Sequence, residues 1–296
     1  MSGRRTRATS VAALLVLATV AHAGPSAQLS NVTGQVEVQA PDAPAWRAAQ
    51  KGEALAPGSV VRTAPGARAE LALDGATARL YAESAARVLA AGRGRGLELY
   101  RGAALFQVQP RASDPFQVET PNAVALAKGT SFTVTADGDG SSVSVVRGLV
   151  GVREPGSLAR EFLVHPGFGV IGGAGRPFAL GLLNHKGDPW EAWSHGAAPS
   201  RPMRRATAGA APPASRESVE SFGPEDDDLA IRLIEARGVR HVRIVGTAGI
   251  DATFTKKDLG QVLRGNTALL GSPLIATLHE RGVTPNAFAR QILDNL

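Results

Sequence analysis

Short runs of alternating apolar and polar residues dominate the chain from Leu29 to about Ile171. The run GQVEVQ at 34–39 places Val36 and Val38 on one face, and the same period of two recurs at 69–75, 116–120, 131–135 and 142–146. Turns rich in Gly, Asp and Pro separate these runs. Because this alternation is typical of half-buried strands joined by tight turns, it predicts an all-β domain, either a sandwich, a barrel or a solenoid.

Two segments of this region share one pattern. LELYRGAALFQV at 97–108 and VSVVRGLVGV at 143–152 each combine an alternating strand, an Arg-Gly corner and a second apolar strand. Two copies separated by about 46 residues favour a stacked repeat. Two unrelated hairpins that both use Arg-Gly at the corner would account for the pattern equally well.

The pattern changes after Arg176. In the segment 173–198, Trp190 and Trp193 are three residues apart, as on one face of a helical turn. We expect them to cover the end of the β domain, with a binding role as the alternative. Residues 199–223 consist mainly of Pro, Ala, Ser and Arg, a composition that predicts a linker.

Residues 224–296 predict a small α/β or mostly helical domain. Acidic residues at 225–228 precede Leu229, Leu233 and Ile234, which suggests a helix that ends at Gly238. A strand is expected at 239–246, and two further helices at 255–265 and near 285–293.

The N-terminus has the features of a signal peptide. A basic start precedes ten apolar residues (11–20) and a small-x-small site that ends at Ala23. Ten apolar residues are too few to span a bilayer, so we expect residues 1–23 to be cleaved, although an uncleaved anchor is the alternative. The mature protein would then be periplasmic or secreted, with membrane contact that is at most peripheral.

Charge and cysteine content support this interpretation. The formal charge falls from +6 to +3 once Arg4, Arg5 and Arg7 are removed without any acid, which gives no argument for nucleic-acid binding. The chain contains no cysteine, so disulfides and a lipid-anchoring thiol are excluded.

The sequence offers no convincing catalytic or metal site. No two histidines have a metal-ligand spacing, including His165 and His195, and no G-x-S-x-G elbow occurs. The acidic segment ADGDGSS at 136–142 lacks the ligand spacing of a calcium loop and is predicted to be a hairpin turn. GRGRG at 92–96 precedes a strand rather than a helix, so Arg93 and Arg95 offer at most a weak anionic contact. We therefore expect no enzymatic activity, no cofactor and no metal.

The segment VETPNAVALAKGTSFTVT at 118–135 is also predicted to be structural rather than catalytic. Thr130 has no base within its motif and Ser131 begins a strand, so this is not a nucleophile loop. Gly129 is expected at a bend of the backbone, and Phe132 is expected to be the first inward-facing residue after it.

This segment closely resembles the V-x-T-P…GT-x-F-x-V signature of FecR domains, the extracytoplasmic module of iron-dicitrate-type signal regulators. The resemblance covers about residues 30–172. The positions that carry it, all expected to be structural, include Gly58, Thr63, Asp74, Gly75, Gly102, Thr120, Pro121, Gly129, Thr130, Phe132 and Gly148.

The resemblance implies a twisted β-solenoid-like domain, predicted at 29–172, that acts in periplasmic sensing or protein contact. Only about ten residues precede the apolar segment, so we expect no cytoplasmic sigma-factor-binding domain. The tail is loosely similar to the short secretin/TonB-type signalling domain. We therefore predict an exported, non-enzymatic envelope protein that binds a partner protein or relays a signal; the alternative is a structural protein associated with the wall or with glycans.

Overall fold

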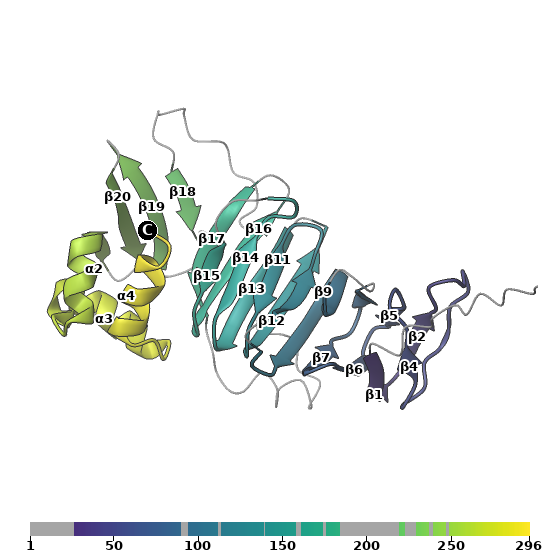
Figure 1. The fold of residues 1–296 in the computed structure, drawn as a ribbon. Coiled ribbons are helices and arrows are strands. Elements are labelled where there is room, and N and C mark those ends of the chain that lie inside the picture. Colours follow the sequence, from purple (N-terminus) through teal and green to yellow (C-terminus); the bar gives the residue numbers. More distant parts are fainter. Residues whose placement is uncertain are drawn as a thin grey trace, which may run out of the picture.

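The computed structural model describes residues 27–89, 94–111, 114–138, 140–157, 161–173, 176–183, 219–222, 229–236, 239–246 and 249–296. The strands β1 to β17, here called the β stack, follow one another along one axis of the molecule, and a smaller unit lies beyond β15 and β17 (Figure 1). The predicted signal peptide, Trp190 and Trp193 lie outside the described residues, as does most of the predicted linker.

The β stack consists of two layers, defined by strand pairing. In neighbour order the first layer contains β4 (Ala54–Leu55), β1 (Ala27–Thr33), β6 (Arg68–Leu73), β7 (Ala76–Leu80), the second half of β9 (Gly96–Val108), β12 (Ser131–Asp137), β13 (Gly140–Arg147), β16 (Phe168–Gly173) and β17 (Arg176–Leu182). The second contains β3 (Arg47–Ala48), β2 (Val36–Gln39), β5 (Val60–Thr63), β8 (Ala85–Val88), the first half of β9, β10 (Phe116–Glu119), β11 (Val124–Ala127), β14 (Val150–Arg153) and β15 (Phe162–Val164).

The chain alternates between the two layers, and almost every pairing is antiparallel. The exception is β9 with β10, which pair in parallel. The predicted hairpin turn at 136–142 joins β12 to β13, where Asp137 Oδ1 accepts a hydrogen bond from the Gly140 N–H at 2.8 Å. The layers do not close into a barrel, so the mainly β prediction is confirmed and its barrel alternative is wrong.

The alternating apolar residues meet between the layers. Phe106 of β9 stacks on Phe132 of β12, with ring centroids 5.1 Å apart, and lies 5.8 Å from Phe116 of the opposite layer. All three rings are fully buried. The prediction that Phe132 faces inward is therefore confirmed, and the core forms because each strand turns one face toward the other layer.

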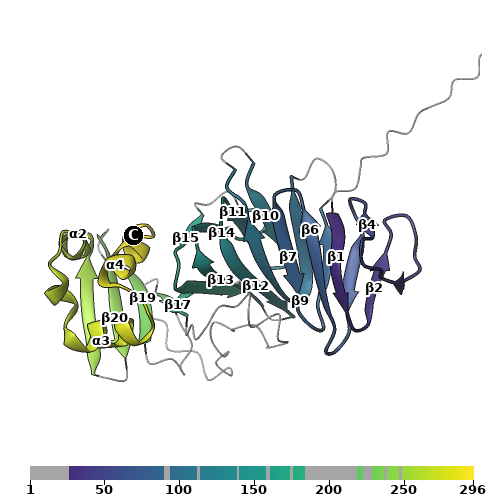
Figure 2. The ribbon, with the colours of Figure 1, turned by 90° about the horizontal axis from the view of Figure 1, so that it is seen from below.

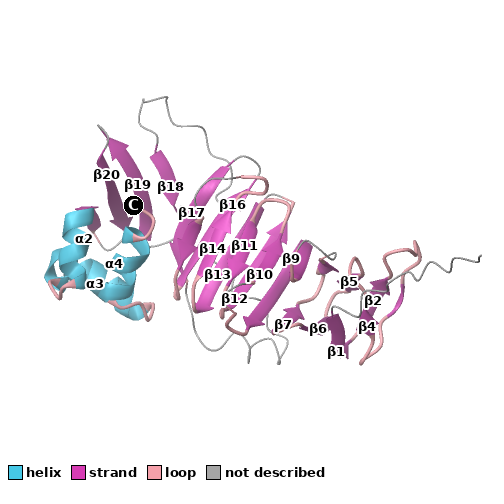
Figure 3. Ribbon diagram, in the orientation of Figure 1, coloured by secondary structure: helices cyan, strands magenta, loops and turns pink. Residues whose placement is uncertain are grey.

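The smaller unit, here called the C-terminal unit, combines an antiparallel sheet with helices (Figure 3). Its strands are β18 (Val219–Phe222), β19 (Leu229–Ala236), β20 (Val239–Gly246) and β21 (Ile250–Thr255). They are followed by α2 (Lys256–Leu263), the 3-10 helix η1 (Thr267–Leu270), α3 (Ser272–Glu280) and α4 (Pro285–Leu293). The expected strand at 239–246 and the two expected helices are confirmed, whereas β18, β21 and α3 were not predicted.

The expected helix at 229–238 is wrong, because residues 229–236 form the strand β19. Leu229 and Ile231 alternate and are buried, and the whole of β19 pairs with β20 from Leu229–Gly246 to Ala236–Val239. Only Arg237 and Gly238 separate the two strands in the sequence. A two-residue connection with Gly between apolar runs is a hairpin signal, and here it outweighs the helical spacing of the leucines.

Local sequence explains where the helices begin. Thr255 caps α2, because its hydroxyl accepts from the Asp258 N–H while the Asp258 carboxylate accepts from the Thr255 N–H. Thr284 caps α4 by accepting from the Ala287 N–H at 3.2 Å. Within the described residues, no helix has both the length and the apolar character needed to cross a membrane.

Candidate functional site

Of the residues considered for chemistry, Arg93 and His195 lie outside the described residues, and the described ones are not arranged as a catalytic site. Thr130 is buried with its hydroxyl oxygen bonded to no described residue, so no base contacts it. Lys128 is exposed, and Ser131 begins β12 as predicted. Among the described residues, no three His, Asp or Glu side chains gather as a metal site would require.

The motif residues Thr63 and Gly102 belong to one corner of the β stack. The Thr63 hydroxyl donates to the Tyr81 carbonyl at 2.6 Å and accepts from the Ser84 N–H at 2.9 Å. The Ser84 hydroxyl in turn donates to the Ala103 carbonyl at 3.0 Å and accepts from the Ala103 N–H at 2.9 Å. Side-chain hydroxyls therefore satisfy backbone groups at the point where the chain leaves one layer for the other.

Gly102 allows this corner to close. Its φ is +85°, and a Cβ atom there would lie 2.5 Å from Ser84 Cα, which is too close for any side chain. The strand β9 crosses from the second layer to the first at this residue. The Arg-Gly corner predicted at 101–102 is thus confirmed.

The second predicted Arg-Gly corner packs on the segment with the GT motif. A Cβ atom on Gly148 would lie 2.7 Å from the Gly129 carbonyl oxygen and 3.0 Å from Thr130 Cα. A Cβ atom on Gly129 would lie 2.8 Å from Pro110 Cγ, and the φ of Gly129 is +85°. The bend predicted at Gly129 is confirmed, and its role is close packing between successive corners.

Asp74 and Gly75 form the turn between β6 and β7, where they anchor two arginines. The Arg111 guanidinium donates to both Asp74 carboxylate oxygens at 2.6 and 2.7 Å. Arg95 donates to the Asp74 carbonyl at 2.8 Å and pairs with the Asp114 carboxylate at 3.0 Å. Only 9% of the Arg95 side chain is exposed, so Arg95 ties loops together and does not present a free anion site.

This turn has one electrostatic consequence. The hydrogen bonds from Arg111 hold the pKa of the Asp74 carboxyl below its ordinary value, with a smaller contribution from the charges of Arg111 and Arg95. A side chain at Gly75 would lie 3.0 Å from the Arg95 guanidinium and 3.1 Å from that of Arg111. Asp74 therefore binds the two arginines, and Gly75 leaves room for their guanidinium groups.

The remaining described motif residues also lie in turns. The Thr120 hydroxyl accepts from the Ala123 N–H at 2.8 Å and closes a turn that exposes Pro121. Gly58 adopts a φ of +89°, and its N–H donates to the Val88 carbonyl. It lines a pocket of about 600 Å³ together with Pro41 and Arg87.

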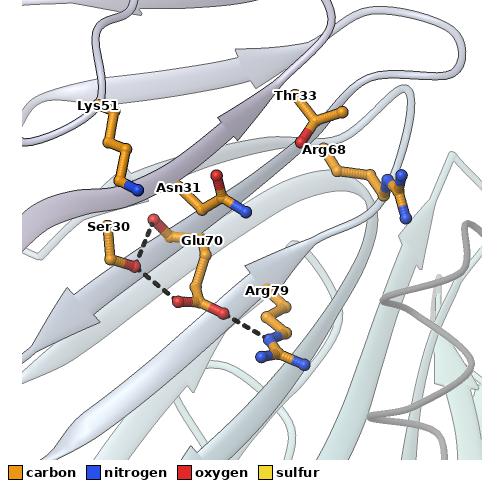
Figure 4. Close-up of a pocket in the computed structure, with 7 residues that line it drawn as sticks. All are labelled: Ser30, Asn31, Thr33, Lys51, Arg68, Glu70 and Arg79. Atoms are coloured by element: carbon orange, nitrogen blue, oxygen red, sulfur yellow. Dashed lines mark hydrogen bonds and ion pairs between the residues drawn. The ribbon is translucent and has the colours of Figure 1, made fainter.

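A polar groove lies on the outer face of the first layer (Figure 4). It has a volume of about 410 Å³ and is lined by Ser30, Asn31, Thr33, Lys51, Arg68, Glu70 and Arg79. The Glu70 carboxylate accepts from the Ser30 hydroxyl at 2.8 Å and from Arg79 Nε at 2.6 Å. A β-bulge at Ser30 orients that hydroxyl. The lining contains three cationic side chains and one carboxylate, so the groove suits a polar or anionic ligand.

The C-terminal helix contacts the end of the β stack, which no sequence pattern indicated. His165 Nε2 lies 2.8 Å from the Asp294 carboxylate, and the Phe168 ring lies 6.4 Å from that of Phe288. Both rings are fully buried. The prediction that His165 is neither a metal ligand nor a base stays a prediction, and its contact with Asp294 holds two distant parts of the chain together.

Known proteins provide an independent comparison. Residues 59–151 match the family model described as FecR protein, a narrower range than the 29–172 predicted for the β domain. The chain is also similar to a crystal structure at 1.65 Å resolution described as a "putative anti-sigma factor from Parabacteroides distasonis ATCC 8503", with 24% identity and a TM-score of 0.39. That match covers 46% of this chain and 65% of the other, so this chain spans less than two thirds of its length.

A second crystal structure with the same description, at 2.50 Å resolution, gives the same identity and TM-score and is covered over 64% of its length. None of the curated proteins compared with the chain is significantly similar to it.

Proposed function

We propose, from the match of residues 59–151 to the FecR protein family model, that the protein is a non-enzymatic interaction module of the cell envelope that takes part in signal relay. The family match is the observation that carries the proposal. The structural roles of the motif residues support it, because they maintain corners and turns and leave the outer faces available for contact.

The finer features belong to the same proposal. The alternation of hairpins between two layers fits a twisted β-solenoid-like arrangement. Export by a signal peptide cleaved after Ala23 would place the mature protein in the periplasm or outside the cell. N-terminal sequencing of the protein from fractionated cells tests this step: a mature chain that begins at Gly24 supports it, and a retained leader in the membrane fraction contradicts it.

Affinity capture tests the relay. The tagged full-length protein would be recovered from mildly cross-linked envelopes, alongside two surface variants. Val239→Asp changes an exposed residue of β20 in the C-terminal unit, and Lys51→Glu changes the groove on the β stack. We expect a membrane protein captured in stoichiometric amounts and lost with one variant only. Recovery of no envelope protein by the wild type would contradict the proposal.

One observation favours a second function, that of a protein associated with the wall or with glycans. The groove around Glu70 carries Lys51, Arg68 and Arg79 and is lined by hydroxyl and amide groups, which suits a polymer with carboxylate or phosphate groups. Co-sedimentation with purified wall material tests it. Binding that Lys51→Glu weakens about tenfold would favour this function, and binding unaffected by that variant would not.

A further inference from the structure

The strand β15 lies at the end of the second layer and pairs with β14 on one side. The pairs are Val150–Val164, Gly151–Leu163 and Val152–Phe162. The N–H and C=O groups of Leu163 and the N–H of His165 point away from β14, to the side where the next strand of a sheet would lie.

Two amide side chains occupy that side, one from Gln291 in α4 and one from Asn295, which follows the C-cap of that helix. The Asn295 side chain accepts from the Leu163 N–H at 3.0 Å and donates to the Leu163 carbonyl at 2.9 Å. Gln291, one turn earlier, donates to the same carbonyl at 2.8 Å and accepts from the His165 N–H at 2.7 Å. The two amides thus make the hydrogen bonds that a neighbouring strand would make.

The surroundings of Gln291 are closely packed, whereas Asn295 and Leu163 are half-buried. Gln291 is fully buried, and a side chain on Gly167 would lie 3.0 Å from Val283. In the first layer, the last strand β17 lies beside β18 and β19 of the C-terminal unit, and Figure 2 shows that unit next to β17 and β15 from a second direction. The C-terminal unit therefore covers the ends of both layers.

We propose that Gln291 and Asn295 act as a surrogate strand that closes the β stack, and that the edge of β15, once uncovered, pairs with the same edge of a second copy of this chain. An open edge presents unpaired backbone groups to other chains, and structures of this kind commonly cover it. Identical edges pair about a two-fold axis, where the two Leu163 residues exchange both N–H···O=C bonds.

The test uses the full-length protein with the double substitution Gln291→Ala and Asn295→Ala. The matched control is Asn286→Ala, because Asn286 is an exposed amide on the same helix. In dilute solution we expect the backbone amides of Leu163 and His165 to exchange with solvent about fivefold faster or more in the double variant, the equivalent of one lost hydrogen bond, and to be unchanged in the control.

Sedimentation at increasing concentration tests the second half of the proposal. The double variant should form dimers at concentrations where the wild type and Asn286→Ala do not. Adding Leu163→Lys should abolish those dimers, because two like charges would face each other across the two-fold axis. A double variant that stays monomeric, or dimers that persist with Leu163→Lys, would overturn the pairing, and unchanged amide exchange would overturn the surrogate strand.

Should the double variant not fold, Asn295→Ala alone provides the measurement. Asn295 is the penultimate residue, and this change leaves the buried Gln291 in place. Faster exchange at Leu163, with His165 unchanged, is then expected, because only Leu163 donates to Asn295. Unchanged exchange at Leu163 would contradict the proposal.

Discussion

Three glycines at corners of the β stack and three glycines in turns of the C-terminal unit serve different purposes. At Gly102, Gly129 and Gly148 a side chain would collide with a neighbouring corner. At Gly249, Gly265 and Gly282 the backbone also has a positive φ, but no atom lies within 4 Å of a Cβ position. At these three corners the stack therefore needs glycine for close approach, whereas at these three turns the C-terminal unit needs it only for backbone conformation.

This difference predicts that substitutions at these two sets of glycines will have different effects on stability. Gly148 packs on the bend at Gly129, and Gly129 packs on Pro110, so we expect a displacement at one of these corners to shift its neighbour. At Gly249, Gly265 and Gly282 no atom is close enough to be displaced, so we expect the effect of a change there to stay local.

The largest effect is expected from Gly102→Ala compared with Gly282→Ala. Both substitutions place a side chain at positive φ, which costs about 1–2 kcal/mol. Gly102→Ala also forces Cβ against Ser84, so we expect a total loss of about 3 kcal/mol or more, against about 1 kcal/mol at Gly282. Urea unfolding measures both; equal losses would refute the distinction between the two regions.

The next effect tests how far the two regions are coupled. Phe288→Ala and Leu259→Ala each remove a fully buried side chain from the C-terminal unit, at a cost of about 3 kcal/mol. Phe288 also contacts Phe168 of the stack, whereas Leu259 lies in α2, which packs on α4 and β21. Hydrogen exchange should therefore increase in β15 and β16 with Phe288→Ala only. An increase there with both variants would mean that the C-terminal unit unfolds as a whole.

The sequence predicted the β stack well for a physical reason. Alternation such as that of Phe116 and Val118 is local, and tight corners need glycine, so both signals can be read within a few residues. In β19 the same alternation was present, but acidic residues before it and the spacing of its leucines suggested a helix. The pairing with β20 decided the outcome, and local propensity does not contain that information.

The candidate site shows the same limit. The motif positions identified Gly102, Gly129 and Gly148, although not what each one touches. Gln291 and Leu163 are 128 residues apart in the chain, and Asn295 and Leu163 are 132 apart. A polar residue on an otherwise apolar helix face was the only available signal, and a buried glutamine has no local pattern that names its partner.

A smaller effect contrasts buried hydroxyl groups in the two regions. Ser84→Ala leaves the Ala103 N–H without its partner in the corner, while the Ala103 carbonyl keeps its bond from the Tyr81 N–H, and the loss should cost about 2 kcal/mol. Thr277 in α3 donates only to the Pro273 carbonyl one turn earlier, so Thr277→Ala should cost less than about 0.5 kcal/mol. Thermal unfolding of the two variants distinguishes these values, and a reversed order would show that the corner bonds are dispensable.

The smallest effect concerns two exposed ion pairs, one in each region. Hydrogen bonds from Arg111 lower the pKa of Asp74, and hydrogen bonds from Arg243 lower the pKa of Asp251. Because each pKa in the folded protein lies below the unfolded value near 3.8, each pair stabilises the protein above that pH and loses its contribution as the pH falls through the lower value. Solvent screening keeps both contributions small.

The two pairs should nevertheless differ in one respect. Arg95 bonds to the Asp74 carbonyl, which the substitution Asp74→Asn retains, so the turn should survive and only its pH-dependent part should disappear. We expect the difference in unfolding free energy between wild type and Asp74→Asn to shrink below about pH 3.8 and in about 0.5 M salt. The difference in unfolding free energy between wild type and Asp251→Asn should also shrink at low pH and in high salt, but hydrogen exchange in the β stack should not change. A cost at Asp74 that is independent of pH and salt would mean that the carboxylate holds the turn by its geometry rather than by its charge.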